Sequence, residues 1–147
     1  MLIYLDNCCY NRPYDDQSQL TISLETQAKL YIQNLVKKDK MKLAVSYILV
    51  YEISKNPHIT NRWNILNYIN AYSDKYVSEN NKETAEKIAV PIQATGVKRM
   101  DALHVACAII AKADYFLTTD KRLLKYKSEK IKIINPIDFI KEMEESE

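Results

Sequence analysis

The chain has 147 residues, a length typical of one domain with a sizeable core, and a net charge of +2 that does not by itself indicate a nucleic-acid binder. Hydrophobic residues make up 47% of it and charged residues 27%, as in an ordinary globular protein. A single glycine excludes the Walker phosphate loop and the dinucleotide fingerprint, which both need several. The two histidines, His58 and His104, form no zinc-protease motif, so carboxylates, hydroxyls and basic side chains remain for chemistry.

The cysteines and the N-terminal residues bear on the compartment. Cys8, Cys9 and Cys107 do not form a disulfide framework and indicate reduced thiols in the cytoplasm. The segment MLIYLDNCCY has no basic region and reaches Asp6 after five residues, so it resembles neither a signal peptide nor an anchor. No apolar run approaches the ~20 residues needed to cross a bilayer. We therefore expect a cytoplasmic protein without a membrane partner.

The first half of the chain alternates between short apolar runs and longer segments of helical periodicity. Asparagine followed by proline at residues 56 and 57 is the signal of an N-cap and a first helical position. The expected elements are a strand at residues 2–6, a helix at 18–39, a strand at Lys42–Ser46, and helices at 47–56 and 57–72.

The second half continues the same alternation. Pro91 is expected to interrupt a helix and Gly96 to end it. Asn135 and Pro136 repeat the helix-start signal, and the last helix leads into an acidic tail from about residue 142. The expected elements are a strand at 76–78, a helix at 81–96, a helix at 100–112, a strand at 115–118, a short helix from 120, a strand at 131–134 and a final helix from 136.

Strands separated by helices imply parallel pairing with right-handed crossovers. The helix at residues 100–112 is apolar nearly all round, so we expect it to be deeply packed. No linker or repeat divides the chain. We predict one α/β domain covering residues 1–147.

Four acidic residues occur where this sheet would gather a ligand, since open parallel sheets bind ligands outside the carboxyl ends of their strands. Asp6 ends the first strand, and Asp120 follows the strand at 115–118. Glu52 lies in a helix that begins at the same edge, and Asp101 opens the helix that precedes that strand. As single residues they could be helix caps, each contributing about 0.5–2 kcal/mol. Together that explanation requires four coincidences at one edge.

Clustered carboxylates repel each other, and burial raises their pKa values. Mg²⁺ or Mn²⁺, which prefer oxygen ligands, would relieve both effects, activate water and stabilise charge on a phosphodiester. Lys98, Arg99 and Lys121 flank the acids and suit a polyanionic substrate, whereas Arg122 and Lys125 are also explained as solvated residues at a helix end.

Other polar residues near these acids have supporting or structural interpretations. Asn7, Thr118 and Thr119 are positioned to orient the acids or to hold water. His104 shares a helix face with Asp101, and we interpret it as a core or hydrogen-bonding residue rather than a catalyst. Tyr10 and Tyr14, in the first loop, could stack on bases.

The segments LDNCC, SYILVYEI, RMDALHVACA, YFLTTDKRLL and INPIDFI, in this order, resemble the PIN-domain family. The family includes the VapC-like ribonuclease toxins of bacterial toxin–antitoxin pairs, and the resemblance spans residues 2 to about 140. It implies a three-layer α/β/α sandwich with a central parallel sheet. It also implies Mg²⁺ or Mn²⁺ held by Asp6, Glu52, Asp101 and Asp120, and endonucleolytic cleavage of single-stranded RNA by activated water.

Two positions differ from many relatives. Asn7 and Cys8 stand where a serine or threonine hydroxyl is common, and Lys121 stands where some relatives have a further acid. The second difference leaves open whether the site holds one metal or two.

The leading hypothesis is a metal-dependent endoribonuclease, with RNA as substrate and a cognate antitoxin and a second copy of the chain as expected partners. Leu30, Ile65 and Tyr68 could form a homodimer face, although their periodicity is equally explained by packing in the core. One alternative is a non-catalytic binding module on the same fold. Another is a phosphohydrolase with Asp6 as nucleophile, a chemistry that usually needs an aspartate where Cys8 stands.

Overall fold

The computed structural model describes residues 1–146 and contains a sheet of five parallel strands in the order β3-β2-β1-β4-β5. Glu147, the last residue of the predicted domain, lies outside the described part. In register, Ile3 of the central strand aligns with Leu43 on one side and Tyr115 on the other. The strands are β1 (Leu2–Leu5), β2 (Lys42–Ser46), β3 (Lys75–Val77), β4 (Tyr115–Leu117) and β5 (Lys132–Ile134).

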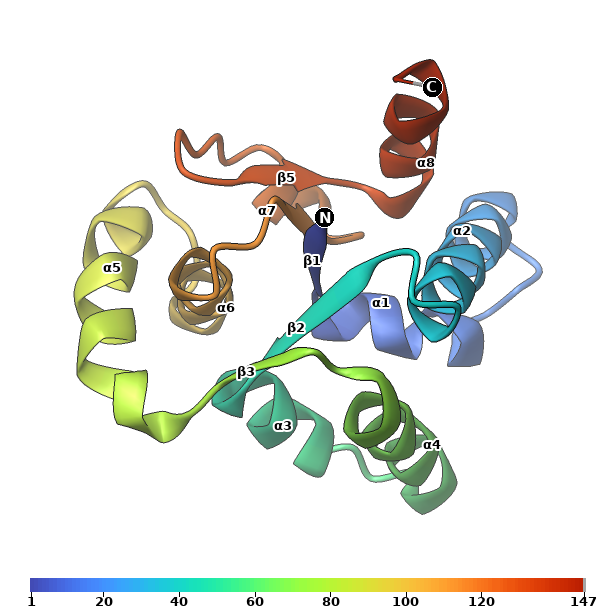
Figure 1. Cartoon of the computed structure of the whole chain (residues 1–147), viewed down its shortest axis with the longest axis horizontal. Coiled ribbons are helices and arrows are strands. Elements are labelled where there is room, and N and C mark those ends of the chain that lie inside the picture. The colour runs from blue at the N-terminus through green and yellow to red at the C-terminus, as the bar shows by residue number, and fades with distance from the viewer. Residues whose placement is uncertain (147) are drawn as a thin grey trace.

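Helices cover both faces of the sheet, so the predicted three-layer α/β/α sandwich is confirmed. Figure 1 shows α5 and α6 on one side of the sheet and α1, α2 and α8 on the other. The helices are α1 (Asn7–Asn11), α2 (Leu20–Lys37), α3 (Tyr47–Ser54), α4 (Ile59–Tyr72), α5 (Lys82–Ala94), α6 (Arg99–Ile110), α7 (Lys121–Leu124) and α8 (Pro136–Glu145), with 3-10 turns η1 (Arg12–Tyr14) and η2 (Glu79–Asn81).

The core lies around β1 and α6. Ile3, Tyr4 and Leu5 are fully buried in the central strand, as expected for a parallel strand covered on both faces. Tyr4 stacks on Phe116 of β4 with ring centroids 5.3 Å apart. Every residue from 102 to 108 in α6 is buried, which confirms the predicted deep packing of this helix. Each large apolar side chain buried here contributes about 1.5–3 kcal/mol.

Two expectations about helix boundaries were wrong. Helix α4 begins at Ile59, because the Asn56 side chain accepts a hydrogen bond from the His58 backbone N–H and forms a turn before the helix. Helix α5 continues through Pro91 without interruption. Proline removes one helical hydrogen bond, and the packing of α5 along α6 offsets that loss.

The helices that leave the carboxyl edge of the sheet position the polar residues predicted there. Helix α1 is capped by the side chain of Asp6, which directly follows β1, and α3 by that of Ser46, the last residue of β2. Helix α7 is capped by the side chain of Asp120, three residues after the end of β4. Helix α6 begins after Gly96, whose φ of +104° is a conformation that other residues rarely adopt. In residues 1–146, no helix is both long and apolar enough to cross a membrane.

Candidate functional site

Asp6 lies at the centre of the carboxyl edge, directly after the central strand. Its Oδ1 accepts a hydrogen bond from the Asn7 backbone N–H at 2.8 Å and caps α1, a helix that the sequence did not predict. Its Oδ2 accepts from Thr118 Oγ1 at 2.8 Å, and the side chain is only 5% exposed in total. Two neighbouring strands therefore fix this carboxylate in one orientation.

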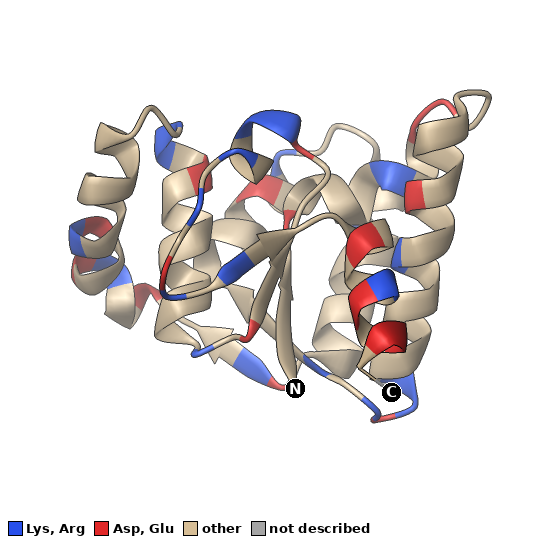
Figure 2. Cartoon of the chain, turned by 90° about the horizontal axis from the view of Figure 1, so that it is seen from above, with Lys and Arg blue, Asp and Glu red and all other residues tan. Residues whose placement is uncertain are grey.

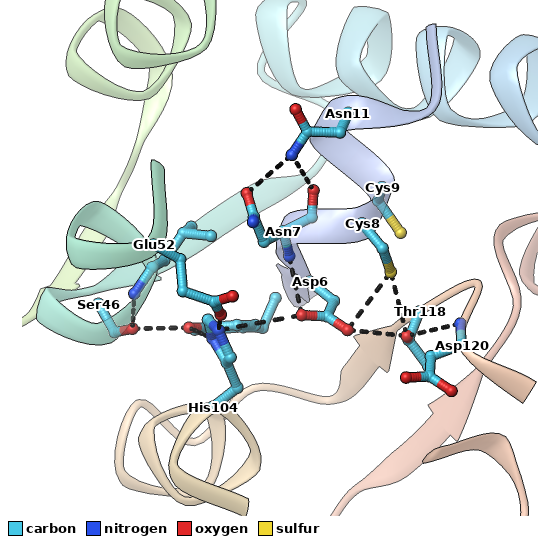
Figure 3. A network of polar contacts seen from close by, with 12 residues as sticks. Asp6, Asn7, Cys8, Cys9, Asn11, Ser46, Glu52, His104, Thr118 and Asp120 are labelled. Carbon is cyan, nitrogen blue, oxygen red and sulfur yellow. Dashed lines mark hydrogen bonds and ion pairs between the residues drawn. The ribbon is translucent and has the colours of Figure 1, made fainter. Parts of the chain in front are cut away.

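Glu52 and His104 lie beside Asp6. His104 Nε2 forms a hydrogen bond with Glu52 Oε1 and lies 4.0 Å from Asp6 Oδ1. Figure 3 shows Asp6 between Glu52 and His104 on one side and Thr118 and Asp120 on the other. Ligand atoms of Asp6, Glu52 and His104 all lie within 4.8 Å of one another. The group could therefore hold a metal ion.

A buried chain of hydrogen bonds joins His104 to residues of β1 and β2. Its Nδ1 is 2.7 Å from the Tyr4 hydroxyl, which in turn is 2.6 Å from Ser46 Oγ. Ser46 Oγ also accepts from the Leu49 backbone N–H at the start of α3, the helix that carries Glu52. The chain links β1, β2, α3 and α6, so the imidazole that holds Glu52 has a fixed ring orientation.

The charge balance at His104 follows from its surroundings. Burial lowers its pKa, but the hydrogen bond to Glu52 and the negative charges of Asp6, Glu52 and Asp101 together raise it above the ordinary value. The imidazole therefore retains its proton to a higher pH than a histidine in water. A protonated His104 compensates part of the negative charge gathered around it.

Asp101, in the first turn of α6, has a pKa that burial and the other carboxylates raise. Burial, followed by the negative charges of Asp6 and Asp120, raises the pKa of Asp101 to about 6. Thr118 contacts both Asp6 and the Asp120 backbone, and Asp101 lines one pocket with Asp120, whereas Asp6 and Glu52 form a compact group with His104. Asp120 caps α7, with its Oδ1 accepting from the Arg122 backbone N–H at 2.8 Å.

Asp101 and Asp120 line a pocket of about 470 Å³ whose rim is basic. We call it the basic pocket; its charged wall is formed by Lys98, Arg122, Lys125 and Lys127 together with the two acids. Basic positions, blue in Figure 2, follow α7 and the loop that leads to β5. The electrostatic surroundings of this pocket suit an anionic ligand that also approaches the acids.

The three basic residues predicted to bind substrate lie in different surroundings. Lys98 lines the basic pocket. Arg99 forms an exposed ion pair with Glu86, with Nη2 and Oε1 3.3 Å apart, and does not line it. Lys121 also lies outside the lining, whereas its neighbour Arg122 belongs to it. Lys127, which sequence reasoning did not single out, adds a further cation.

The predicted supporting residues contact the acids to different degrees. Thr118 donates to Asp6, and its Oγ1 accepts from the Asp120 backbone N–H at 3.1 Å, so one hydroxyl orients two acids. Asn7 contributes its backbone N–H to Asp6. Thr119 is buried, and its backbone N–H lies 3.4 Å from Cys8 Sγ. Cys8 Sγ in turn lies 3.4 Å from Asp6 Oδ2.

Sequence reasoning missed the roles of Tyr4, Ser46 and His104 as a unit. His104 was interpreted as a core or hydrogen-bonding residue, and it is both, but its partner Glu52 was not foreseen. Ser46 ends β2, so the strand-end argument that selected Asp6 also applied to it. Tyr4 alternates with apolar residues in β1 and gives no polar signal in the sequence.

The donor set fits a hard divalent cation. Asp6, Glu52, Asp101 and Asp120 offer carboxylate oxygens, which Mg²⁺ and Mn²⁺ prefer. Across residues 1–146, no Lys or Arg forms a salt bridge with any of these four acids. The arrangement can therefore hold a cation and a phosphate next to each other.

The sequence matches no family model and is not significantly similar to any curated protein. Solved structures do share its fold. VapBC2 from Rickettsia felis, bound to a DNA fragment from its promoter, aligns over 92% of this chain and 98% of its own with a TM-score of 0.57 and 16% identity. FitAcB from Neisseria gonorrhoeae aligns over 91% and 97%, with a TM-score of 0.56 and 16% identity.

A structure of FitAB bound to an IR36 DNA fragment aligns over 92% of this chain and 95% of its own, with a TM-score of 0.53 and 15% identity. The chain has a PIN-like fold. Each likeness covers more than 90% of this chain. At 15–16% identity it establishes the fold, and the chemistry of the PIN-like site has to be argued from its own residues.

Proposed function

We propose that this protein is a metal-dependent endoribonuclease that cleaves single-stranded RNA and acts as the toxin of a toxin–antitoxin pair. The observation that carries the proposal is the convergence of Asp6, Glu52, Asp101 and Asp120 at one sheet edge. Two geometric observations support it: Asp6 and Glu52 lie in one group with His104, with ligand atoms within 4.8 Å of one another, and Asp101 and Asp120 line the same pocket. The basic pocket beside these acids supports a polyanionic substrate.

Asp6, Glu52, Asp101 and Asp120 would hold Mg²⁺ or Mn²⁺. When bound, such a cation lowers the pKa of a coordinated water and offsets charge on a phosphodiester. The chain's own residues prepare the site. Thr118 and the Asn7 backbone fix both oxygens of Asp6, and His104 fixes Glu52. Lys98, Arg122, Lys125 and Lys127 would grip the backbone phosphates beside the cut.

A cleavage assay tests the proposal. Purified protein is incubated with fluorescently labelled single-stranded RNA in the presence of Mn²⁺, of Mg²⁺ or of EDTA. We expect cleavage with either metal, none with EDTA, and none for Asp6→Asn or Asp101→Asn. Asp74→Asn, at the opposite edge of the sheet, is the matched control and keeps wild-type activity. Activity that survives chelation and both site substitutions would refute the mechanism.

The same experiment separates a catalytic protein from a binding module. If the fold only serves as a scaffold, RNA binding persists without cleavage and Mn²⁺ leaves the melting temperature unchanged. A metal that binds only the native state, at a free concentration about 100 times its dissociation constant, adds roughly 2.7 kcal/mol to the free energy of unfolding. We expect such a stabilisation for the wild type and its loss in Asp6→Asn.

The proposed partners are RNA, a cognate antitoxin and a second copy of the chain, and the proposed location is the cytoplasm. The structural neighbours VapBC2 and FitAB, both bound to DNA, support a partner that recognises its own promoter. Of the three residues predicted for a homodimer face, Leu30 is exposed, Tyr68 is partly buried against the core, and Ile65 is buried in the core and cannot contribute. Leu20, Leu24 and Tyr31 instead form an exposed apolar stripe along α2. Light scattering with and without the co-expressed neighbouring gene product tests both assemblies.

A further inference from the structure

A second pocket, of about 560 Å³, opens next to Glu52 on the side of Asp6 away from Asp120. Four asparagines from α1, the turn before α4 and α4 itself contribute to its wall, and we call it the amide pocket. Its volume falls within the usual range for small-ligand sites, about 300–1,000 Å³. Its lining consists of Asn7, Asn11, Tyr14, Asp15, Glu52, Lys55, Asn56, His58 and Asn61.

Three of these asparagines form a relay of hydrogen bonds. Asn56 Nδ2 donates to Asn11 Oδ1 at 3.2 Å, and Asn11 Nδ2 donates to Asn7 Oδ1 at 3.1 Å. Figure 3 shows Asn11 and Asn7 following one another along α1 and leading to Asp6. The relay joins segments 45 positions apart in the sequence, so it orders the amides in advance of any ligand.

The relay leaves hydrogen-bonding groups available to a ligand. Within residues 1–146, Asn7 Nδ2 and the side-chain amide of Asn61 have no hydrogen-bond partner in the chain. Tyr14 is 44% exposed and lines the same pocket, whereas Tyr10, the other tyrosine predicted to stack on a base, is fully buried. Amide donors and acceptors beside an exposed aromatic ring match the edge and the face of a nucleobase.

The charges of the amide pocket disfavour a phosphate. Glu52 and Asp15 contribute negative charge to its wall, and Arg12 balances Asp15 at 2.9 Å between Nη1 and Oδ2. The Lys55 ammonium lies over the Tyr51 ring, 5.1 Å from its centroid. The basic pocket on the other side of Asp6 carries four Lys and Arg side chains. The two pockets therefore differ in the part of a nucleotide that each can accept.

We infer that the amide pocket binds an unpaired nucleobase of the RNA adjacent to the scissile phosphate and gives the enzyme its base preference. This inference rests on the proposed ribonuclease function. Asn7 Nδ2 and Asn61 contact the base edge, and Tyr14 stacks on its face. Because Asn7 directly follows Asp6 and Glu52 belongs to both the pocket and the acidic cluster, the bound base is next to the phosphodiester that is cut.

The test measures kcat/KM on single-stranded RNAs that differ only in the nucleotides on either side of the cut. The wild type is expected to prefer one base at one of these positions by about 10-fold or more, the usual discrimination of a well-placed amide pair. Asn61→Ala, which leaves the relay intact, is expected to reduce that preference to about 3-fold or less. Tyr14→Leu is the second variant, so that a folding defect in one does not decide the result.

Lys127→Ala in the basic pocket is the matched control. It is expected to lower kcat/KM for all four bases by the same factor, because phosphate contacts carry no base information. A wild type without base preference, or a preference that both Asn61→Ala and Tyr14→Leu leave unchanged, overturns the inference while ribonuclease activity stands.

A binding measurement separates this failure from a failure of the proposed function. The cleavage-deficient Asp6→Asn chain is titrated with labelled four-nucleotide RNAs that differ at one base, and fluorescence anisotropy is recorded. Base-selective binding that Asn61→Ala removes supports the amide pocket even if the wild type cleaves no RNA. Equal binding of all four sequences by Asp6→Asn, with and without Asn61→Ala, contradicts it.

Discussion

The two edges of the sheet both carry aspartates at strand ends, yet they use them differently. At the amino edge, Asp114 Oδ2 accepts from the Leu2 backbone N–H and Asp74 Oδ2 from the Leu43 N–H, each at 2.8 Å. Both residues are exposed, and each completes the hydrogen bonding of the start of a neighbouring strand. At the carboxyl edge, Asp6 is buried and the pKa of Asp101 is raised by burial and by neighbouring acids.

The difference follows from chain direction. Parallel strands leave unpaired N–H groups at their amino ends, which single carboxylates satisfy one at a time. At the carboxyl ends, helices α1, α3, α6 and α7 all begin, so their N-terminal partial positive charges point toward one region. That region tolerates several carboxylates together. The same residue type is therefore a strand cap at one edge and a member of a charged cluster at the other.

The largest expected contrast between the edges is in activity. Asp6→Asn keeps the capping of α1, because asparagine is an equally good N-cap, but removes a central negative charge. We expect RNA cleavage to fall at least about 100-fold, as for the loss of other key groups around a metal. Initial rates with Mn²⁺ measure this, and circular dichroism checks the fold. A decrease of less than a few-fold would place the chemistry elsewhere.

The second contrast concerns the buried hydrogen bonds below the carboxyl edge. Tyr4→Phe removes the hydroxyl between His104 and Ser46 and leaves His104 Nδ1 without its partner. We expect a loss of about 1–3 kcal/mol in the free energy of unfolding, the usual cost of a buried polar group without a partner. Urea titration measures it. Tyr47→Phe, which alters a partly buried tyrosine on α3, should cost much less.

The third contrast is in pH dependence. The pKa of Asp101 is about 6 in the folded chain against an ordinary 3.8, so between these values the folded state binds more protons than the unfolded state. This group's contribution therefore lowers stability as the pH rises through that window, and the loss is complete above about pH 6.

Asp101→Asn removes this loss. In EDTA at neutral pH, we expect the variant to be more stable than the wild type by on the order of 1 kcal/mol, after allowance for the screening of a half-exposed group. The difference should shrink as the pH falls toward 4, where the folded wild-type carboxyl is protonated and the unfolded one is partly protonated. Urea unfolding at the two pH values measures it. An equal difference in stability at both pH values would mean that the pKa of Asp101 is not raised in the folded chain.

The smallest effect is expected at the amino edge. Asp114→Ala removes one hydrogen bond to an exposed strand end, and the expected cost is about 0.5–1 kcal/mol. Cleavage per folded molecule should stay at the wild-type level. Thermal melting and the same RNA assay measure the two quantities. A large loss of activity in Asp114→Ala would erase the distinction between the edges.

Much of the fold was predictable because its signals are local. The second strand, Lys42–Ser46, was placed to the residue, and the Asn135 cap with Pro136 in the first turn starts α8 as expected. The parallel order of the strands implied that Asp6 and Asp120 would meet at one edge, and they do. Their role as metal ligands stays a prediction. Helix α1 was missed, since five residues provide too little periodicity to detect.

The sequence by itself determined where the strands end, which acids follow them and that no glycine-rich phosphate loop is available, because these depend on residue identity and neighbouring positions. Only the tertiary structure decided that His104 would bind Glu52, that Tyr4 and Ser46 would support it, and that Asn56 would reach Asn11. The partners in these contacts lie 42 to 100 positions apart. Such contacts depend on how packed layers bring side chains together, and no local pattern records that.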